Sequence, residues 1–114
     1  MKKINKNYLL LILLLLTLIF RLLRVSTPNR YIFDEVYHTV TARGYSQGIK
    51  EAYNPFSKSP EPNTAYDWLH PPLAKLIQAT SIKALGDNSF SWRLPSAIFG
   101  TLSVFALYYL GLTI

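Results

Sequence analysis

Three polar clusters in this 114-residue chain contain the residue types that most often do chemistry. They are FDEVYH at residues 33–38, HPPLAKL at residues 70–76 and WRLPSAIFGTLSV at residues 92–104. Together they supply two adjacent carboxylates, both histidines of the chain and two cations close to apolar sequence. Such a set could transfer a proton, bind a metal ion or bind a phosphate group.

Asp34 and Glu35 are the candidates for a general base. A carboxylate that is partly desolvated near a membrane surface is a stronger base toward a hydroxyl nucleophile. The alternative is structural, because Asp34 could cap the first turn of a helix while Glu35 is simply solvated. From the residues alone both interpretations stay open.

Lys75 and Arg93 are the cations expected nearest the membrane surface on the loop side. A lipid-linked phosphate needs cationic partners, and arginine can bind it through two parallel hydrogen bonds. The same side chains could instead anchor the chain to lipid headgroups. These two possibilities also stay open.

His38 and His70 could supply two nitrogens to a metal ion, with neighbouring carboxylates supplying one or two oxygens. Their spacing matches no strong zinc pattern, and Glu35-x-x-His38 would need a second copy to build a di-iron bundle. We therefore assign no metal ligand and no certain cofactor; a divalent metal is possible but not favoured. His70 precedes two prolines, so it could merely extend the chain ahead of a helix.

Two apolar blocks must position these clusters. Residues 8–25, which include LLLILLLLTLIF, would reach about 27 Å as a helix, close to the thickness of a hydrocarbon core. We predict an all-α integral membrane protein with residues 1–7 in the cytoplasm, a first transmembrane helix at 8–25, a loop at 26–92 and a second transmembrane helix at 93–114. A cleaved signal peptide is the alternative for the first block, although no small-x-small cleavage site follows it.

The formal net charge of +6 is concentrated beside the first apolar block. Residues 26–95 are nearly balanced, and the excess comes from Lys2, Lys3, Lys6, Arg21 and Arg24. Such clusters usually meet lipid headgroups, whereas nucleic-acid binding needs a basic stripe on a folded surface, so no nucleic-acid partner is expected. Similar charge on both flanks gives only a weak preference for a cytoplasmic amino terminus. The absence of cysteine excludes disulfides and thiolate metal sites.

The loop should contain short surface helices separated by an irregular segment. A first helix is expected in residues 33–50, with Asp34 as its N-cap and Gly44 and Gly48 weakening its end. Several prolines within residues 52–72 forbid a long helix there. A second helix should then run from Pro72 to a cap at Gly86.

In their order and approximate spacing, the three clusters resemble the amino-terminal region of protein O-mannosyltransferases. More broadly they are similar to bacterial and archaeal glycosyltransferases that use a phospholipid sugar carrier, with the lipid A aminoarabinose transferases more distant. The resemblance implies a multi-pass GT-C fold in the plasma membrane, with the loop on the extracytoplasmic side. It also implies transfer of a mannose-type sugar, with inversion, from a polyprenyl-phosphate carrier to a protein or lipid acceptor.

The resemblance implies a role for each candidate residue. Asp34 would be the catalytic carboxylate and Glu35 its support, while Lys75 and Arg93 would bind the donor phosphate. His38 and His70 would support the motifs. This division agrees with the chemistry, because inverting transfer needs a base for the acceptor and cations for the departing phosphate.

The sequence stops at Ile114, directly after the second apolar block, without a polar flank. We therefore expect a fragment of a larger multi-pass glycosyltransferase that is inactive alone. The alternatives are a small non-enzymatic membrane protein, a pseudogene remnant, or a peptide secreted after signal cleavage.

Overall fold

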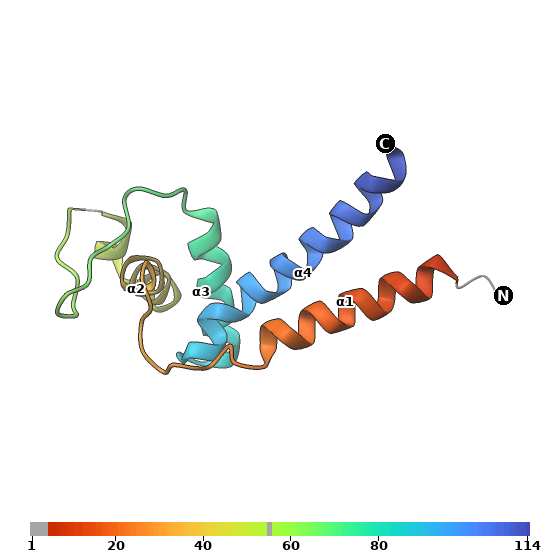
Figure 1. Ribbon diagram of the computed structural model, residues 1–114. Helices are drawn as coiled ribbons and strands as arrows, with labels where there is room; N and C mark the ends of the chain where they lie inside the picture. Colours follow the sequence, from red (N-terminus) through yellow and green to blue (C-terminus); the bar gives the residue numbers. More distant parts are fainter. Residues whose placement is uncertain (1–4, 55) are drawn as a thin grey trace. The chain divides into compact units, whose positions relative to one another are not determined.

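A computed structural model describes residues 5–54 and 56–114, and all regular structure in them is helical. The elements are α1 (Lys6–Leu22), α2 (Glu35–Gln47), the 3-10 helix η1 (Lys50–Tyr53), α3 (Leu73–Leu85) and α4 (Ser89–Thr113) (Figure 1). The predicted all-helical fold is confirmed. The predicted basic positions Lys2 and Lys3 and the loop residue Pro55 lie outside the described residues.

The chain divides into two compact units. The first, which we call the span unit, comprises residues 1–25 and 96–114; the second, the loop unit, comprises residues 26–95. The loop unit therefore extends past the predicted boundary at residue 92 and includes the first turns of α4, which begins at Ser89 rather than at Arg93.

α1 is a helix of 17 residues with local hydrogen bonds at its first turn and at its one threonine. The side chain of Asn5 accepts a hydrogen bond from the Asn7 amide (3.0 Å), which caps the first turn. The hydroxyl of Thr17 donates to the Leu13 carbonyl (2.6 Å), so it adds no unsatisfied group to the leucine run. The helix ends at Leu22, before the predicted limit at residue 25.

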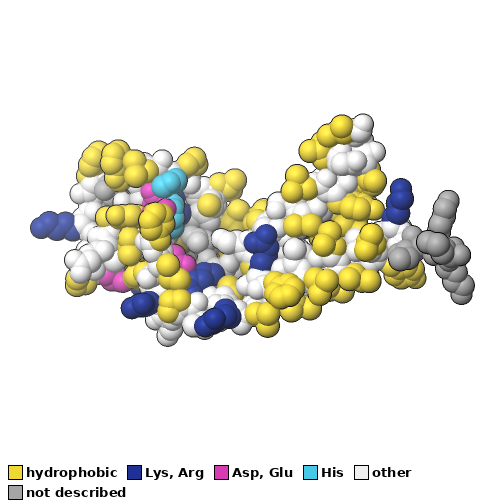
Figure 2. All heavy atoms as spheres, viewed as in Figure 1, with side chains coloured by type: hydrophobic (Ala, Val, Ile, Leu, Met, Phe, Trp, Pro, Cys, Tyr) yellow, Lys and Arg dark blue, Asp and Glu magenta, His cyan; other side chains and the backbone are white. Residues whose placement is uncertain are grey.

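α4 has 25 residues and is long and apolar enough to cross a membrane. Among the described helices, it alone meets both requirements of length and hydropathy. Hydrophobic side chains cover the surfaces of α1 and of the outer part of α4 (Figure 2). Exposed apolar surface of this extent needs a cover, which a bilayer or further helices would provide.

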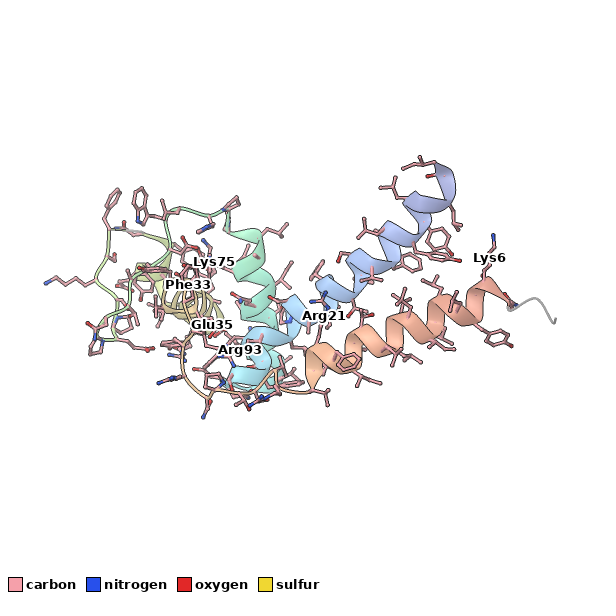
Figure 3. All side chains as sticks on the ribbon, viewed as in Figure 1. Lys6, Arg21, Phe33, Glu35, Lys75 and Arg93 are labelled. Atoms are coloured by element: carbon pink, nitrogen blue, oxygen red, sulfur yellow. The ribbon has the colours of Figure 1, made fainter. Side chains whose placement is uncertain are left out.

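Within the span unit, Arg21 is accommodated by a glycine. Its guanidinium lies where a Cβ on Gly100 would be only 2.7 Å away, so a larger residue there would displace the arginine (Figure 3). Because an arginine stem is long and apolar, such a side chain can follow a helix surface toward the headgroups.

In the loop unit, α2 lies beside α3 and η1. Gly48 ends α2 in the left-handed conformation (φ 70°) that glycine adopts without strain. Gly44 lies inside α2, where an added Cβ would overlap the Cβ of Ala52 in η1. The two glycines expected to weaken this helix therefore have different tasks, since one ends it and the other admits a neighbour.

The core of the loop unit consists of two small clusters that both contact Tyr31. One contains Val40, Ala52 and Tyr66, and the other contains Ala42, Ile82 and Trp92. Trp92 is 5% exposed, so it belongs to the core of the loop unit and not to its surface. The physical reason is that the first turns of α4 pack in the loop unit.

Pro95 lies inside α4, where it cannot donate the hydrogen bond that the Ser91 carbonyl would normally accept. The hydroxyl of Ser81 on α3 donates to that carbonyl instead (2.6 Å). The side-chain amide of Gln78 similarly donates to the Trp92 carbonyl (3.1 Å). The proline therefore frees the Ser91 carbonyl, and the two contacts from α3 fix the start of α4.

Candidate active site

Glu35, in the first turn of α2, is held by Arg93 from the start of α4 (Figure 3). Arg93 Nε donates to Oε1 (2.6 Å) and Nη2 donates to Oε2 (2.8 Å), the paired geometry typical of strong arginine–carboxylate contacts. The backbone amide of Ile32 also donates to Oε2 (2.9 Å). Both carboxylate oxygens of Glu35 are therefore held by hydrogen bonds.

Arg93 also fixes the segment before α2. Its Nη1 donates to the carbonyl of Pro28 (3.0 Å), and its Nη2 donates to the carbonyl of Arg30 (2.9 Å). One guanidinium thus joins the start of α4 to the chain that leads into α2. Binding of the donor phosphate by Arg93 stays a prediction, and a phosphate would have to share the cation with Glu35.

Asp34 precedes Glu35 but has different surroundings. It is the N-cap residue of α2, and its carbonyl accepts from the amides of Tyr37 and His38 (both 3.0 Å), yet its side chain makes no capping hydrogen bond. The side-chain cap that the sequence allowed at Asp34 is therefore absent, and only the Asp34 carbonyl contributes hydrogen bonds to the first turn. The half-buried carboxylate is left without a partner among the described residues.

Most other carboxylates in the described part of the chain, unlike Asp34, have an ion-pair partner. Of the six in the chain, four form ion pairs: Glu35, Glu61, Asp67 and Asp87. Within residues 5–54 and 56–114, Asp34 and Glu51 form no side-chain hydrogen bond or ion pair, and Glu51 is exposed on η1. Among the described residues, Asp34 is therefore the half-buried carboxylate that forms neither contact.

The residue before Asp34 has a strained backbone. Phe33 adopts φ 49°, a left-handed conformation that is rare for a bulky residue, while its side chain is 85% exposed. Strain of this kind costs roughly 1–3 kcal/mol and is concentrated at functional sites. It sets the direction in which the chain enters α2 and so helps to orient Asp34.

A second cluster surrounds Asp67, which is not among the candidate residues expected from the sequence. Nδ1 of His38 lies 2.7 Å from Oδ2 and Nδ1 of His70 lies 3.2 Å from Oδ1. Nζ of Lys75 donates to Oδ2 at 3.0 Å. The structure thus brings together both predicted support histidines and a predicted phosphate ligand around one carboxylate.

Burial alone would raise the pKa of Asp67, whose side chain is 2% exposed. Hydrogen bonds from Lys75, His70 and the Leu69 amide, with the charge of Lys75, outweigh burial and lower the pKa to about 2. The backbone amide of Asp67 donates to the hydroxyl of Thr41 on α2 (2.8 Å). The carboxylate is therefore ionised and held at both its side chain and its backbone.

Lys75 is itself buried, with 2% of the residue exposed. Besides Asp67, its Nζ donates to the carbonyl of His70 (2.8 Å), which the following prolines hold away from a helix. The short spacing after His-Pro-Pro places Lys75 in the first turn of α3. From there its side chain reaches back to the His70 carbonyl. Contact between Lys75 and the donor phosphate stays a prediction.

One signal could have identified Asp67 in the sequence. It lies three residues before His70, so a turn brings the two side chains together, and both backbone amides of Leu69 and His70 donate to its Oδ1 (3.0 and 3.3 Å). The signal was hidden because the surrounding prolines indicated only an irregular loop. The contact with His38 could not be read from spacing at all.

A third polar group, around Arg43, holds the loop unit together. Arg43 pairs with Glu61 and Asp87, and its Nη1 donates to the hydroxyl of Tyr31 (2.6 Å), which donates to Glu61 (2.8 Å). Burial and the hydrogen bond to Glu61 raise the pKa of Tyr31 to about 12, against the opposing charge of Arg43. These contacts link α2 to both ends of the loop.

The chain is similar to known proteins over most of its length. The family model described as dolichyl-phosphate-mannose-protein mannosyltransferase, PMT, matches residues 11–114. The chain is 35% identical over 77 residues to a polyprenol-phosphate-mannose–protein mannosyltransferase of Corynebacterium glutamicum, an alignment that covers 67% of this chain and 14% of that protein. No solved structure matches the chain. The chain belongs to the PMT family of mannosyltransferases.

Proposed function

We propose that this chain supplies the first membrane spans and the catalytic loop of a polyprenyl-phosphate-mannose-dependent protein mannosyltransferase. One observation carries the proposal: Asp34 is half-buried and unpartnered among the described residues, while the adjacent Glu35 is held by Arg93. A free carboxylate beside a fixed one is what a general base and its scaffold require.

In the proposed reaction, Asp34 accepts the proton of the acceptor hydroxyl as that oxygen attacks the anomeric carbon. The bond between that carbon and the donor phosphate oxygen breaks, and the polyprenyl phosphate leaves with the bonding electrons. Attack from the face opposite the phosphate inverts the anomeric centre. The acceptor is a hydroxyl of a protein or, as the broader family resemblance allows, of a lipid.

Cations must stabilise the departing phosphate. Lys75 and Arg93 are the proposed cations, each sharing its charge with a carboxylate, Asp67 and Glu35 respectively. His38 and His70 support the loop through Asp67. Arg93 also acts as a positioning residue, because it fixes Glu35 and so the first turn of α2.

The membrane placement is part of the same proposal. Residues 8–25 and the part of α4 after Pro95 cross the plasma membrane, residues 1–7 are cytoplasmic, and the loop unit is extracytoplasmic. Support comes from the exposed apolar surfaces of α1 and α4 and from the length of α4. The bilayer would cover those surfaces and hold a lipid-linked donor beside the loop.

The chain spans 14% of the length of its relative, so the role of Asp34 is best tested in a full-length enzyme. A chimera provides that test. This chain would replace the corresponding segment of the Corynebacterium glutamicum protein, and membranes would be assayed for mannose transfer from polyprenyl-phosphate-mannose to an acceptor peptide. We expect Asp34→Asn to lower transfer by roughly 10²–10⁴-fold, the usual contribution of a general base, with unchanged membrane insertion.

Glu51→Gln is the matched control, because it neutralises the other unpartnered carboxylate at an exposed position. It should leave transfer unchanged. Near-normal turnover in Asp34→Asn would remove Asp34 from the catalytic role. If the unmutated chimera inserts but transfers no mannose, the chain does not supply the catalytic loop as proposed.

A further inference from the structure

The two histidines around Asp67 form a cluster of metal-ligating groups. Their ring centroids lie 4.6 Å apart, and each Nδ1 faces a different oxygen of the same carboxylate. One donor atom from each of His38, Asp67 and His70 lies within 4.8 Å of the other two. Histidine and acidic side chains lie together on the visible surface (Figure 2). Three ligands from two distant segments therefore converge at one point.

Two imidazole nitrogens and a carboxylate oxygen are a donor set that suits Zn²⁺ and related divalent transition metals. In sites of this type three protein ligands leave at least one position open to water or substrate. Bonds of about 2.0–2.2 Å require a modest contraction of the cluster. The side chains of His38 and His70 are 27% and 51% exposed, so both have room to move.

The carboxylate at the centre of the cluster is held independently of the histidine rings. Asp67 accepts hydrogen bonds from two backbone amides and from Lys75, and its own amide donates to Thr41. Partners of this kind orient a ligating carboxylate and are a regular feature of metal sites. The site is therefore preorganised at Asp67 and adaptable at the histidines.

Lys75 determines what the loaded site would attract. Its ammonium lies 3.0 Å from Asp67 Oδ2, so a bound divalent cation would share one negative charge with a second cation. The loaded site would be net positive, and its open position would favour an oxyanion such as a phosphate. The same lysine limits metal affinity, because it competes for the carboxylate.

We propose that His38, Asp67 and His70 bind one divalent transition-metal ion of the zinc type, with a coordination position open to an oxyanion. The proposal goes beyond the proposed function, since proton transfer to Asp34 requires no metal. Its test therefore needs no measurement of sugar transfer, and either proposal can fail while the other stands.

The composition of the chain leaves no other histidine and no cysteine to compete for the metal ion. His38 and His70 are its only two histidines, and it has no cysteine. A tag-free form of the full 114-residue chain, stripped with a chelator in lipid nanodiscs, would be titrated with Zn²⁺ against a chromophoric competitor and with Co²⁺ by visible absorption. We expect one ion per chain, with Co²⁺ giving the strong bands of a low-coordinate site.

His70→Gln is the first variant, because the His70 ring is half exposed and its loss should spare the fold. We expect zinc affinity to fall at least about 10-fold, and to fall similarly in His38→Gln. Glu51→Gln is the matched control and should bind as the unmodified chain does. Circular dichroism and tryptophan fluorescence would confirm that each variant is folded.

The proposal is overturned if the unmodified chain binds no stoichiometric zinc at micromolar concentrations. It is equally overturned if folded His38→Gln and His70→Gln variants bind zinc as tightly as the unmodified chain. In either case the cluster is a hydrogen-bonded support for the loop only.

Discussion

Asp34 and Glu35 are adjacent in sequence, yet they make opposite use of the same chemical group. Glu35 accepts three hydrogen bonds within the loop unit, whereas no described residue contacts the carboxylate of Asp34 through a hydrogen bond or ion pair. A helix of 3.6 residues per turn points consecutive side chains in different directions, so only one of the pair can face Arg93. A carboxylate held at both oxygens therefore lies next to one that no described residue holds.

The contact between Glu35 and Arg93 should contribute measurably to stability. Because hydrogen bonds to charged groups are each worth about 1.5–3 kcal/mol, Glu35→Gln or Arg93→Lys should lower the free energy of unfolding by about that amount. Lysine should not substitute, since it cannot form the paired contact. Urea unfolding in detergent, followed by tryptophan fluorescence, measures the change.

A double-mutant cycle distinguishes this contact from independent effects. The combined Glu35→Gln, Arg93→Lys variant should be less destabilised than the sum of the single changes, because both remove the same interaction. Strict additivity would show that the two side chains stabilise the loop unit separately.

Tyr31 should make the loop unit sensitive to alkaline pH. Its pKa of about 12 in the folded chain lies above the ordinary value of 10.0, so the folded state retains a proton that the unfolded state loses. Its contribution is thus fully present below pH 10.0 and is lost as pH rises toward about 12. The measurement is the free energy of unfolding across this interval, compared with Tyr31→Phe.

The comparison isolates one tyrosine from the other titrating groups. Tyr31→Phe lacks the hydroxyl that contacts Arg43 and Glu61, so it should be less stable at neutral pH. The stability gap between the two proteins should narrow at alkaline pH. A gap that stays constant would contradict the predicted role of Tyr31.

At the scale of elements, α2 positions most of the candidate site. It carries Asp34 at its start, Glu35 in its first turn and His38 one turn later. Residues four apart lie on the same helix face, so His38 follows Asp34 one turn later on that face. α2 in turn packs against α3 and η1.

Gly44 provides the close approach of η1 to α2. Gly44→Ala should destabilise the loop unit by about 1–3 kcal/mol, because its Cβ would overlap that of Ala52 and overpacking costs about that much. Thermal unfolding followed by circular dichroism provides the measurement. A combined Gly44→Ala, Ala52→Gly variant should recover part of the loss, since it removes the overlapping atom.

Gly48 offers a contrasting control on the same helix. An added Cβ there meets no atom within 4 Å, but the residue has φ 70°. Gly48→Ala should therefore be destabilising through backbone strain alone, and Ala52→Gly should not rescue it. Equal rescue of both variants would mean that contact with Ala52 is not the cause.

For the whole molecule, the division into a span unit and a loop unit gives a testable membrane topology. The chain contains no cysteine, so single-cysteine variants can be labelled without background. Lys58, exposed in the loop unit, and Lys6, at the start of α1, are suitable positions. We expect an impermeant maleimide to label Lys58→Cys in intact cells and Lys6→Cys only after permeabilisation.

The opposite labelling pattern would place the loop in the cytoplasm and would remove the proposed access to a donor on the extracytoplasmic side. Labelling of both positions in intact cells would contradict the first membrane crossing. The exposed side chains of both lysines make absence of labelling an informative result, because each is accessible to reagent within its unit.

The sequence alone determined features that depend on neighbouring residues. The two apolar blocks, the helices that begin near Asp34 and Pro72, and the helix-ending glycines follow from composition and local periodicity. The order of the motifs was likewise sufficient to indicate the family. The helical fold class was therefore predictable, as were the helices that carry most of the candidate residues.

Only the tertiary structure decided how those residues divide their tasks. Glu35 meets Arg93 across 58 residues of sequence, and Asp67 meets His38 through the packing of a proline-rich loop on α2. Trp92 is buried because the first turns of α4 belong to the loop unit. Such contacts depend on the packing of distant segments, and a local sequence pattern has no information about which distant partner occupies a side chain.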